Sequence, residues 1–480
     1  MLLEEVPMVF VYLAKILTYM NNVGVIALQQ LITDPAQEHS QLSNIVKWNQ
    51  QLFERISERS ARIGVVGLGY VGLPLAIGWA RAGFLVTGID IDPQRVSMCH
   101  QRKSWITDVS SEDLGSLVSE GQLTATIDTL VFKELDVITV CVPTPLNEAK
   151  EPDIGAILEV VDAITASLHP GQLIILESTS FPGTTDEYIL PRLQQSGLKV
   201  GEDFFLAYSP ERIDPGNTHY GLHNTPKVIA GITACCMQLT MALYETVVDT
   251  VIPVSSTRTA ELVKLFENTF RAVNIGLVNE LAMMANLLSV DVWEVIAAAG
   301  TKPYGFTPFY PGPGVGGHCI PIDPRYLAWK LSTLNYRSRF IEAACEINEQ
   351  MPNYVVERIN RVLNDAGKCL DASRVLVLGI AYKRDVGDLR ESPAIEIIHM
   401  LREQKVQVDY VDPYIPVLAL KEEVLTAVPL DEERVRSADC VVILTDHSVF
   451  DYTSIIRTAS LLVDTRNATA GVTEPHIIRL

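Results

Sequence analysis

The stretch Ile63-Gly-Val-Val-Gly-Leu-Gly-Tyr-Val-Gly72 decides the fold that we expect of this chain. Its first four residues have the apolar character of a short buried strand, and the residues from Leu73 to Ala82 have the composition of a helix. A strand, the pattern GxGxxG and a helix in direct succession are the signature of a dinucleotide-binding unit. The stretch therefore predicts a Rossmann-type domain, and a merely structural turn is the alternative interpretation.

The three glycines of this loop make different contributions to such a unit. Gly67 makes the turn, Gly69 lets the backbone approach a pyrophosphate, and Gly72 allows the helix to pack closely on the strand. The N-terminus of the helix adds positive potential for the phosphates. Tyr70 and Val71 complete the loop, so all five residues are expected cofactor contacts.

A second predicted strand, Phe84 to Ile89, ends in Asp90. A carboxylate about 20 residues after the glycines accepts a hydrogen bond from the ribose 2′-hydroxyl of NAD and repels the 2′-phosphate of NADP. NAD is therefore the expected cofactor.

Three further apolar runs, at residues 136–142, 172–176 and 205–208, predict more strands of one doubly wound sheet. In such a sheet, ligands bind beyond the carboxyl ends of the strands. Thr144, Ser178 and Thr179 follow two of these runs and would line the nicotinamide and substrate side. The alternative is that they are ordinary polar residues at strand ends.

Residues 258–288 predict one helix of roughly 30 residues. Lys264, Asn268 and Arg271 share one of its faces, because they are spaced i, i+4 and i+7. The surrounding positions are apolar, and a buried lysine or arginine needs a partner. The three side chains would face an anionic ligand or an oxyanion; the alternative is a solvated stripe on a helix that joins two domains. Such a helix would also offer a dimerisation surface.

A glycine-rich loop, Gly314-Val-Gly-Gly-His-Cys-Ile-Pro-Ile-Asp-Pro324, carries a single cysteine. A cysteine becomes a nucleophile where positive potential lowers its pKa and the backbone leaves it accessible. The glycines around Cys319 remove side chains that would block a substrate, and Asp323 follows four residues later. A buried structural cysteine beside a tight turn is the alternative.

The last third of the chain predicts a second α/β domain without GxGxxG. Its expected strands lie at residues 373–378, 406–411, 440–444 and 460–463, and a helix begins at Pro393. Its loops carry cations suited to phosphate, for which simple surface solvation is the alternative. These cations are Lys383, Arg384, Arg390 and Arg466.

The segments divide the chain into four parts of an α/β protein with two Rossmann-like doubly wound domains joined by a long central helix. We expect an N-terminal helical extension (1–58), an NAD-binding domain (59–252), a central catalytic and dimerisation domain (253–350) and a C-terminal domain (351–480). Residues 8–32 are apolar-rich but interrupted by Lys15 and by amides. They predict an accessory helix, or a start codon placed upstream of the true one, rather than a membrane span.

Composition excludes some classes of function for these 480 residues. A net charge of −20 argues against a broad nucleic-acid interface. The eight cysteines have neither CxxC nor zinc spacing, so we expect reduced thiols, a cytoplasmic location and no metal site.

Seven motifs in order make the chain, over about residues 60–470, resemble the UDP-glucose/GDP-mannose dehydrogenase family. The motifs are GLGYVGLPLA (67–76), VPTP (142–145), ESTSFPGTT (177–185), SPER (209–212), KLFENTF (264–270), GVGGHCIPID (314–323) and GIAYKRDVGDLRESPA (379–394). SPERIDPGN, ENTFRAVNI and KPYGFTPFYPGPGVGGHCIPIDP are most similar to the branch that oxidises UDP-N-acetylhexosamines, the UDP-N-acetylglucosamine type in particular.

The resemblance implies an NAD-dependent, two-step oxidation of a sugar C6 alcohol to a carboxylate, for acidic surface polysaccharides. Cys319 would form a thiohemiacetal and then a thioester, while Lys264 and Asn268 hold the developing oxyanion. Asp323 would orient the lysine or activate water, and Glu211 and Thr179 would support proton transfer. The implied cofactor contacts are Gly67, Gly69, Tyr70, Val71, Gly72, Asp90, Thr144, Thr179 and Arg390. The implied UDP-sugar contacts are Glu211, Lys264, Asn268, Arg271, Gly314, Lys383 and Arg466.

Two departures from the family pattern bear on the substrate. UDP-glucose enzymes have a second glutamate where this chain has Pro215, preceded by Asp214, and a lysine where it has Ile322. Both favour a UDP-N-acetylhexosamine over UDP-glucose. UDP-N-acetylgalactosamine, UDP-N-acetylmannosamine and UDP-glucose stay open as substrates, and a nucleotide-sugar-binding regulator without catalysis is the alternative from another class.

Overall fold

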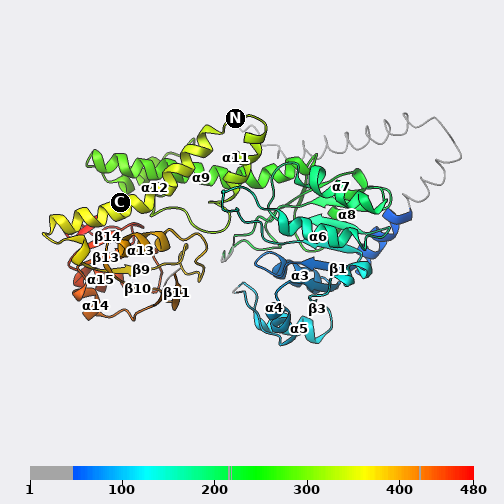
Figure 1. The fold of residues 1–480 in the computed structure, drawn as a ribbon, viewed down its shortest axis with the longest axis horizontal. Coiled ribbons are helices and arrows are strands. Elements are labelled where there is room, and N and C mark those ends of the chain that lie inside the picture. Colours follow the sequence, from blue (N-terminus) through cyan, green and yellow to red (C-terminus); the bar gives the residue numbers. More distant parts are fainter. Residues whose placement is uncertain (1–46, 107, 215–216, 218, 421–422) are drawn as a thin grey trace, which may run out of the picture.

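Two β-sheets, each covered by helices, form two lobes that are bridged by long helices (Figure 1). The computed structural model describes residues 47–106, 108–214, 217, 219–420 and 423–480. The expected accessory helix over residues 8–32 lies outside the described residues.

A helix over residues 47–57 leads into the first lobe. Leu52 and Ile56, one turn apart, are buried in the core of that lobe. Arg55 pairs with Asp136, whose carboxylate also accepts a hydrogen bond from the backbone N–H of Arg62. The helix is therefore fixed to the sheet at the start of its first strand.

The first lobe contains an eight-stranded sheet in the order β3-β2-β1-β4-β5-β6-β7-β8. Neighbouring strands are parallel except β6 and β7, which are antiparallel. The strands are β1 (Arg62–Val66), β2 (Leu85–Ile89), β3 (Leu123–Thr126), β4 (Val137–Val140), β5 (Leu173–Leu176), β6 (Phe205–Tyr208), β7 (Lys227–Gly231) and β8 (Val251–Pro253). The helices are α3 (Gly72–Arg81), α4 (Pro93–His100), α5 (Ser111–Ser119), η1 (Thr129–Glu134), α6 (Gly155–Thr165), η2 (Thr184–Ile189), α7 (Leu190–Leu193), η3 (Gln194–Ser196) and α8 (Ala234–Tyr244).

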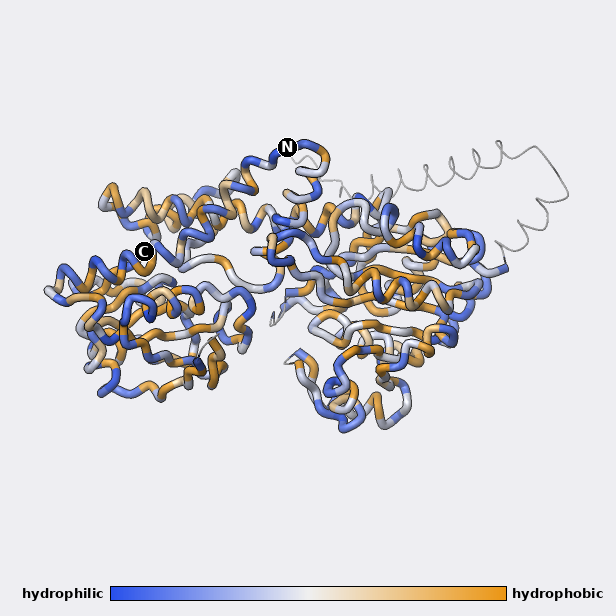
Figure 2. Tube along the Cα trace, viewed as in Figure 1, coloured by the Kyte–Doolittle hydropathy of each residue, from blue (hydrophilic) through white to orange (hydrophobic). Residues whose placement is uncertain are grey.

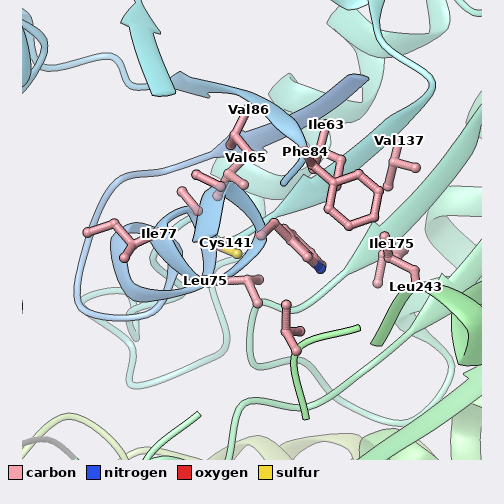
Figure 3. Close-up of a cluster of buried hydrophobic side chains, with 14 of the residues drawn as sticks. Ile63, Val65, Leu75, Ile77, Phe84, Val86, Val137, Cys141, Ile175 and Leu243 are labelled. Carbon is pink, nitrogen blue, oxygen red and sulfur yellow. The ribbon is translucent and has the colours of Figure 1, made fainter. Parts of the chain in front are cut away.

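Apolar residues fill both faces of this sheet, as expected where helices cover a parallel sheet. Strands β4, β5 and β6 are buried at every position. Figure 3 shows the core around α3, in which Leu75 gathers with Val65 of β1, Val86 of β2 and Ile175 of β5. This packing fixes the loop between β1 and α3 at the carboxyl edge of the sheet.

Long helices bridge the lobes. Helix α9 (Thr257–Leu287) has 31 residues and begins at Ser256, whose hydroxyl accepts a hydrogen bond from the N–H of Thr259. Helix α12 (Arg339–Asp365) packs along α9. Two shorter helices, α10 (Val292–Gly300) and α11 (Asp323–Thr333), also pack against α9. Figure 2 shows hydrophobic segments inside both lobes and mixed hydropathy along the bridging helices.

The second lobe contains a five-stranded parallel sheet in the order β10-β9-β13-β14-β15. Its strands are β9 (Arg374–Leu378), β10 (Gln407–Val411), β13 (Cys440–Ile443), β14 (Leu462–Asp464) and β15 (Ile477–Arg479), with a separate hairpin of β11 (Val417–Ala419) and β12 (Val424–Thr426). Its helices are η4 (Leu370–Ala372), α13 (Pro393–Glu403), α14 (Glu432–Ser437) and α15 (Tyr452–Thr458).

The structure confirms the predicted fold class of two Rossmann-like domains and a long central helix. The apolar run at residues 136–142 forms a strand only over Val137–Val140, and the strands β3, β7, β8, β11, β12 and β15 were not predicted. Within the part of the chain that the structure describes, no helix combines the length and apolar composition needed to cross a membrane.

Candidate active site

A cavity of about 990 Å³ brings together residues from both lobes and from the central helices. Most residues predicted for a site line it. They are Gly67, Gly69, Tyr70, Val71, Thr144, Ser178, Thr179, Glu211, Lys264, Asn268, Arg271, Gly314, Cys319, Lys383, Arg390 and Arg466. Gly72, Asp90, Asp323 and Arg384, also predicted, are not among the lining residues.

The glycine loop has the geometry that a dinucleotide requires. Gly67 has φ +91°, and a Cβ there would lie 2.6 Å from the carbonyl oxygen of Cys141. A Cβ on Gly72 would lie 1.8 Å from the carbonyl oxygen of Gly67, so the start of α3 can approach β1 only with glycine. A Cβ on Gly69 would meet no atom within 4 Å, which leaves open space in front of the helix N-terminus. These residues fit the pyrophosphate of NAD.

Asp90 supports this loop from behind. Its carboxylate accepts hydrogen bonds from the N–H groups of Leu68 at 2.8 Å and Asp92 at 2.9 Å, and Arg95 lies 3.2 Å away. The side chain is only 4% exposed at the end of β2. It is therefore placed beside the cofactor loop, where a carboxylate with remaining acceptor capacity can select a ribose hydroxyl.

Cys319 lies in the loop that ends at the N-terminus of α11. Its carbonyl oxygen accepts the N–H of Asp323 at 2.8 Å, so the loop and helix form one unit. The thiol is half-buried. Burial raises its pKa, against the opposing effect of Lys264, Arg390 and Arg271.

Lys264, Asn268 and Asp323 form a buried cluster next to that loop. The ammonium group of Lys264 donates to the carbonyl oxygen of Glu211 at 2.5 Å, and the amide of Asn268 donates to Oδ2 of Asp323 at 2.6 Å. Burial alone would lower the pKa of Lys264, but Cys319, Asp323 and Glu211 outweigh it and raise that pKa. Lys264 is thus a cation held beside the cysteine, which suits an oxyanion.

Burial raises the pKa of Asp323 to about 6. The residue is 1% exposed and does not line the cavity, whereas Asn268 and Lys264 do. Asp323 therefore contacts Asn268 and interacts with Lys264 by charge from behind the cavity, a position that suits orientation of the lysine better than direct activation of water.

The polar residues at the strand ends of the first sheet have different roles. Ser178 donates its hydroxyl to the carbonyl oxygen of Val142 at 2.8 Å and stabilises the sheet edge. Thr144 is buried, and its carbonyl oxygen accepts the hydroxyl of Tyr326 at 2.9 Å. Thr179 is half-buried and lines the cavity.

Three of the four predicted phosphate-binding cations, Lys383, Arg390 and Arg466, line the cavity from the C-terminal lobe. Lys383 pairs with Asp214 at 2.8 Å, which connects the C-terminal lobe to the loop after β6. Arg390 lies over the ring of Tyr70 at 4.7 Å, and its carbonyl oxygen accepts the N–H of Gly317 at 2.9 Å. The C-terminal lobe thus contacts both the cofactor loop and the cysteine loop.

The remaining cations differ in their exposure and partners. Arg271 is exposed at the cavity, although Lys264 and Asn268 on the same face are buried. Arg466 lies 3.5 Å from Asp446, which also pairs with Arg384. Gly314, with φ +137°, packs against Pro393 at the start of α13. A phosphate could compete for Arg466, whereas Arg384 stays outside the cavity.

Sequence reasoning missed a buried ionic group beneath the site. Lys227 of β7 lies 2.6 Å from Glu177 and 3.3 Å from Glu211, and all three side chains are buried. Glu177 also accepts the hydroxyl of Tyr244. A lysine at the start of an apolar strand pattern indicates a buried ammonium that needs a counter-charge, but it does not indicate which carboxylates supply that charge.

Models of three consecutive domains of one family match the chain. They are the NAD-binding domain of the UDP-glucose/GDP-mannose dehydrogenase family at residues 61–248, its central domain at 258–350 and its UDP-binding domain at 376–471. Together they cover most of the chain.

Similar proteins extend this match. UDP-N-acetyl-D-glucosamine 6-dehydrogenase of Pseudomonas aeruginosa is 37% identical over 74% of this chain and 84% of its own length. UDP-N-acetyl-D-glucosamine 6-dehydrogenase of Salmonella typhi is 34% identical over 81% of this chain and 90% of its own length. The structure of a UDP-D-ManNAc dehydrogenase from Pyrococcus horikoshii has a TM-score of 0.79 at 34% identity, and the match covers 87% of this chain and 98% of that one.

Proposed function

The chain belongs to the UDP-glucose/GDP-mannose dehydrogenase family and is an NAD-dependent nucleotide-sugar dehydrogenase, and we propose that it oxidises C6 of UDP-N-acetylglucosamine to the carboxylate. The main support for oxidation through a cysteine is the position of Cys319 beside the buried Lys264, Asn268 and Asp323. This group lies at a cavity between the two lobes.

One observation supports N-acetylglucosamine in particular, and two others support a UDP-N-acetylhexosamine over UDP-glucose. Two relatives are named UDP-N-acetyl-D-glucosamine 6-dehydrogenase, and the match covers more than four-fifths of the length of each. Ile322 stands beside Asp323 where UDP-glucose enzymes have lysine, and Pro215 replaces their second glutamate. UDP-N-acetylmannosamine remains the second candidate, because the Pyrococcus relative of known structure has that substrate in its name.

The cysteine divides the oxidation into two stages. NAD, held at the glycine loop between β1 and α3, would supply the hydride acceptor for C6 in both stages. Between them, Sγ of Cys319 bonds to the aldehyde carbon and the carbonyl oxygen becomes the oxyanion of a thiohemiacetal. Lys264 donates to this oxyanion and Asn268 supplies a second hydrogen bond, so both stabilise charge that develops during the reaction. Loss of the hydride leaves a thioester on Cys319.

Hydrolysis of the thioester completes the reaction. A water oxygen bonds to the acyl carbon and the C–S bond breaks, so that the carboxylate forms; one proton of the water passes to Glu211 and the other to the departing sulfur of Cys319. Thr179 and Glu211 line the cavity on this side and position the water. Asp323, with a pKa of about 6, is ionised at neutral pH and keeps Lys264 charged and oriented.

The pyrophosphate groups of the UDP-sugar and of NAD bind to different walls of the cavity. Lys383 and Arg466 hold the UDP pyrophosphate by charge, with Arg271 and Gly314 beside them. Gly67, Gly69, Tyr70 and Val71 hold the NAD pyrophosphate, and Gly72 lets α3 begin close enough to β1 for this. Asp90, Thr144 and Arg390 complete that site.

The enzyme is a homodimer in this proposal, since exposed apolar residues on α9 offer a surface for a second copy. Phe266 is 63% exposed and Leu277 is 58% exposed on that helix. All eight cysteines are free, which suits a cytoplasmic enzyme that supplies a uronic acid for acidic surface polysaccharides.

A panel assay tests the substrate. Purified protein is incubated with NAD and separately with UDP-N-acetylglucosamine, its galacto and manno epimers, UDP-glucose and GDP-mannose, and NADH is followed by absorbance. We expect the highest kcat/KM for UDP-N-acetylglucosamine. Activity confined to UDP-glucose would refute the substrate, and ligand binding without NADH from any sugar would favour a non-catalytic regulator.

A further inference from the structure

Two buried lysines contact Glu211, one at its carboxylate and the other at its backbone carbonyl. Nζ of Lys227 lies 3.3 Å from the carboxylate oxygen Oε2, and Nζ of Lys264 lies 2.5 Å from the backbone carbonyl oxygen. Lys264 lines the cavity, whereas Lys227 is not among its lining residues as far as the structure describes them. Lys264 therefore faces the cavity, and Lys227 lies behind Glu211, the residue that holds Lys264.

Lys227 has a complete set of partners of its own. It lies on β7 and is 4% exposed, with Oε2 of Glu177 at 2.6 Å and the ring of Tyr244 at 5.4 Å. The neighbouring carboxylates Glu177 and Glu211 outweigh burial and raise the pKa of Lys227, so it stays charged. A buried ion group costs desolvation, and well-packed apolar residues would often stabilise a fold equally well. A role beyond stability is therefore expected.

The other carboxylate oxygen of Glu211 fixes the loop that follows β6. Oε1 accepts the N–H groups of Arg212 and Ile213, each at 2.7 Å. Arg212 in turn pairs with Glu267 on α9 at 2.7 Å. With both carboxylate oxygens occupied, the backbone carbonyl of Glu211 has a defined direction, and Lys264 takes its position from it.

We propose that Lys227 is a positioning residue, which fixes the carboxylate of Glu211 so that the carbonyl of Glu211 holds the ammonium of Lys264 against Cys319. This role rests on the proposed function, in which Lys264 stabilises an oxyanion formed at Cys319. Lys227 itself does not touch the substrate or the cofactor.

Several charged groups face Glu211 from the elements around it. Lys227 comes from β7, Glu177 from the end of β5 and Lys264 from α9. Burial would raise the pKa of Glu211, but Lys227, Lys264 and the two N–H donors outweigh it and lower that pKa. Replacement of Lys227 by a neutral residue removes the largest opposing effect, so the pKa of Glu211 should rise.

Three variants test the role of Lys227. Lys227→Met removes the charge at similar volume, Lys227→Gln also removes it but keeps an amide donor for Glu177 and Glu211, and Lys227→Arg keeps the charge. The matched control is Lys368→Met, which breaks an ion pair of 2.6 Å with Asp439 in the C-terminal lobe, away from the cavity. Thermal unfolding and circular dichroism establish that each protein is folded.

The first readout is steady-state NADH formation from pH 5.5 to 9. We expect Lys227→Met to lower kcat about 100-fold with a much smaller change in KM, as for the loss of one oxyanion donor. Below neutral pH its kcat should fall more steeply than that of wild type, since protonation of Glu211, which has lost its counter-ion, adds to the acid limb that Asp323 sets. Lys227→Arg should recover at least tenfold of the lost kcat, and Lys368→Met should keep the wild-type profile.

The second readout needs no sugar nucleotide and so separates this inference from the proposed function. Alkylation of Cys319 by iodoacetamide is followed by mass spectrometry of its peptide as a function of pH. Because Lys264 lowers the pKa of this thiol, displacement of Lys264 should move the alkylation midpoint to higher pH.

A shift of the midpoint in Lys227→Met, or in Lys227→Gln if the methionine variant does not fold, supports the positioning role even if no sugar nucleotide gives NADH. Folded variants with the wild-type midpoint and the wild-type pH profile would overturn it, whatever the substrate proves to be.

Discussion

Asn268 on α9 and Asp323 at the start of α11 are joined by a hydrogen bond of 2.6 Å between Nδ2 and Oδ2. This contact connects the helix that carries Lys264 to the helix that directly follows the Cys319 loop. Because both side chains are buried, it holds the lysine and the cysteine in one rigid arrangement. Such preorganisation is what stabilisation of a short-lived oxyanion requires.

Asp323→Asn should separate activity from stability. In the wild-type protein, activity should fall as the pH decreases through about 6, because Asp323 becomes protonated and its negative charge no longer stabilises the ammonium of Lys264. The amide variant should lose this acid limb and have kcat at least about 100-fold lower. NADH formation measured from pH 5 to 9 checks both expectations, and an unchanged acid limb in the variant would contradict them.

The same carboxyl group should make the fold less stable at high pH. Its pKa is about 6 in the fold and 3.8 in the reference state, so the folded protein retains a proton that the unfolded chain releases. The resulting stability is present below pH 3.8 and is lost as the pH rises through about 6. The difference corresponds to about 3 kcal/mol at pH 8. Asp323→Asn should therefore unfold at an equal or higher temperature than wild type at pH 8, and a clearly lower Tm there would contradict this.

Gly69→Ala and Gly72→Ala form a matched pair in one loop. The added methyl group on Gly72 would collide with the carbonyl oxygen of Gly67, so this variant should be destabilised by several kcal/mol and lose NAD binding. The methyl group on Gly69 meets no protein atom, so that variant should keep the wild-type Tm but have a KM for NAD about tenfold higher. Differential scanning fluorimetry and NAD titration measure both. Equal effects of the two substitutions would contradict a cofactor role for this loop.

Asp90→Asn tests the choice of NAD over NADP. Loss of the negative charge weakens the hydrogen bond to the ribose and removes the repulsion of a 2′-phosphate, so kcat/KM for NAD should fall about tenfold while that for NADP rises. The control is Asp128→Asn, another aspartate that accepts a backbone N–H after a strand, at η1. It should leave both cofactors unaffected. Wild-type cofactor preference in Asp90→Asn would refute the assignment.

Phe266→Asp tests the dimer surface. Phe266 and Phe270 are one turn apart on α9 and are 63% and 48% exposed, so a charge there should oppose burial against a second copy. Analytical ultracentrifugation should show a dimer for wild type and a monomer, or a dimer at least about 100-fold weaker, for the variant. Val449→Asp on the C-terminal lobe is the control. A monomeric wild-type protein would contradict the expectation directly.

Much of this architecture could be predicted from local sequence patterns. The strand, glycine loop and helix at residues 62–81 are determined by apolar runs and by Gly67 and Gly72, at which a Cβ would collide with the backbone. The face of α9 that carries Lys264 and Asn268 follows from helical periodicity alone. These features depend on near neighbours in the chain.

Features that depend on distant neighbours could not be predicted. Lys227 follows a proline and begins a strand, but its two carboxylate partners come from the ends of other strands. Burial of Asp323 outside the cavity and exposure of Arg271 at its edge depend on how α11 and the C-terminal lobe pack on α9. Periodicity placed Arg271 with Lys264 correctly, but it could not give the different depths of the two residues.

The ratio of NADH formed to UDP-N-acetylglucosamine consumed tests the central claim most directly. With limiting sugar nucleotide and excess NAD, we predict two NADH per sugar, a uronic acid as the product by mass spectrometry, and no turnover in Cys319→Ser. A ratio of one with a released aldehyde, or full activity in Cys319→Ser, would contradict the two-stage oxidation on Cys319.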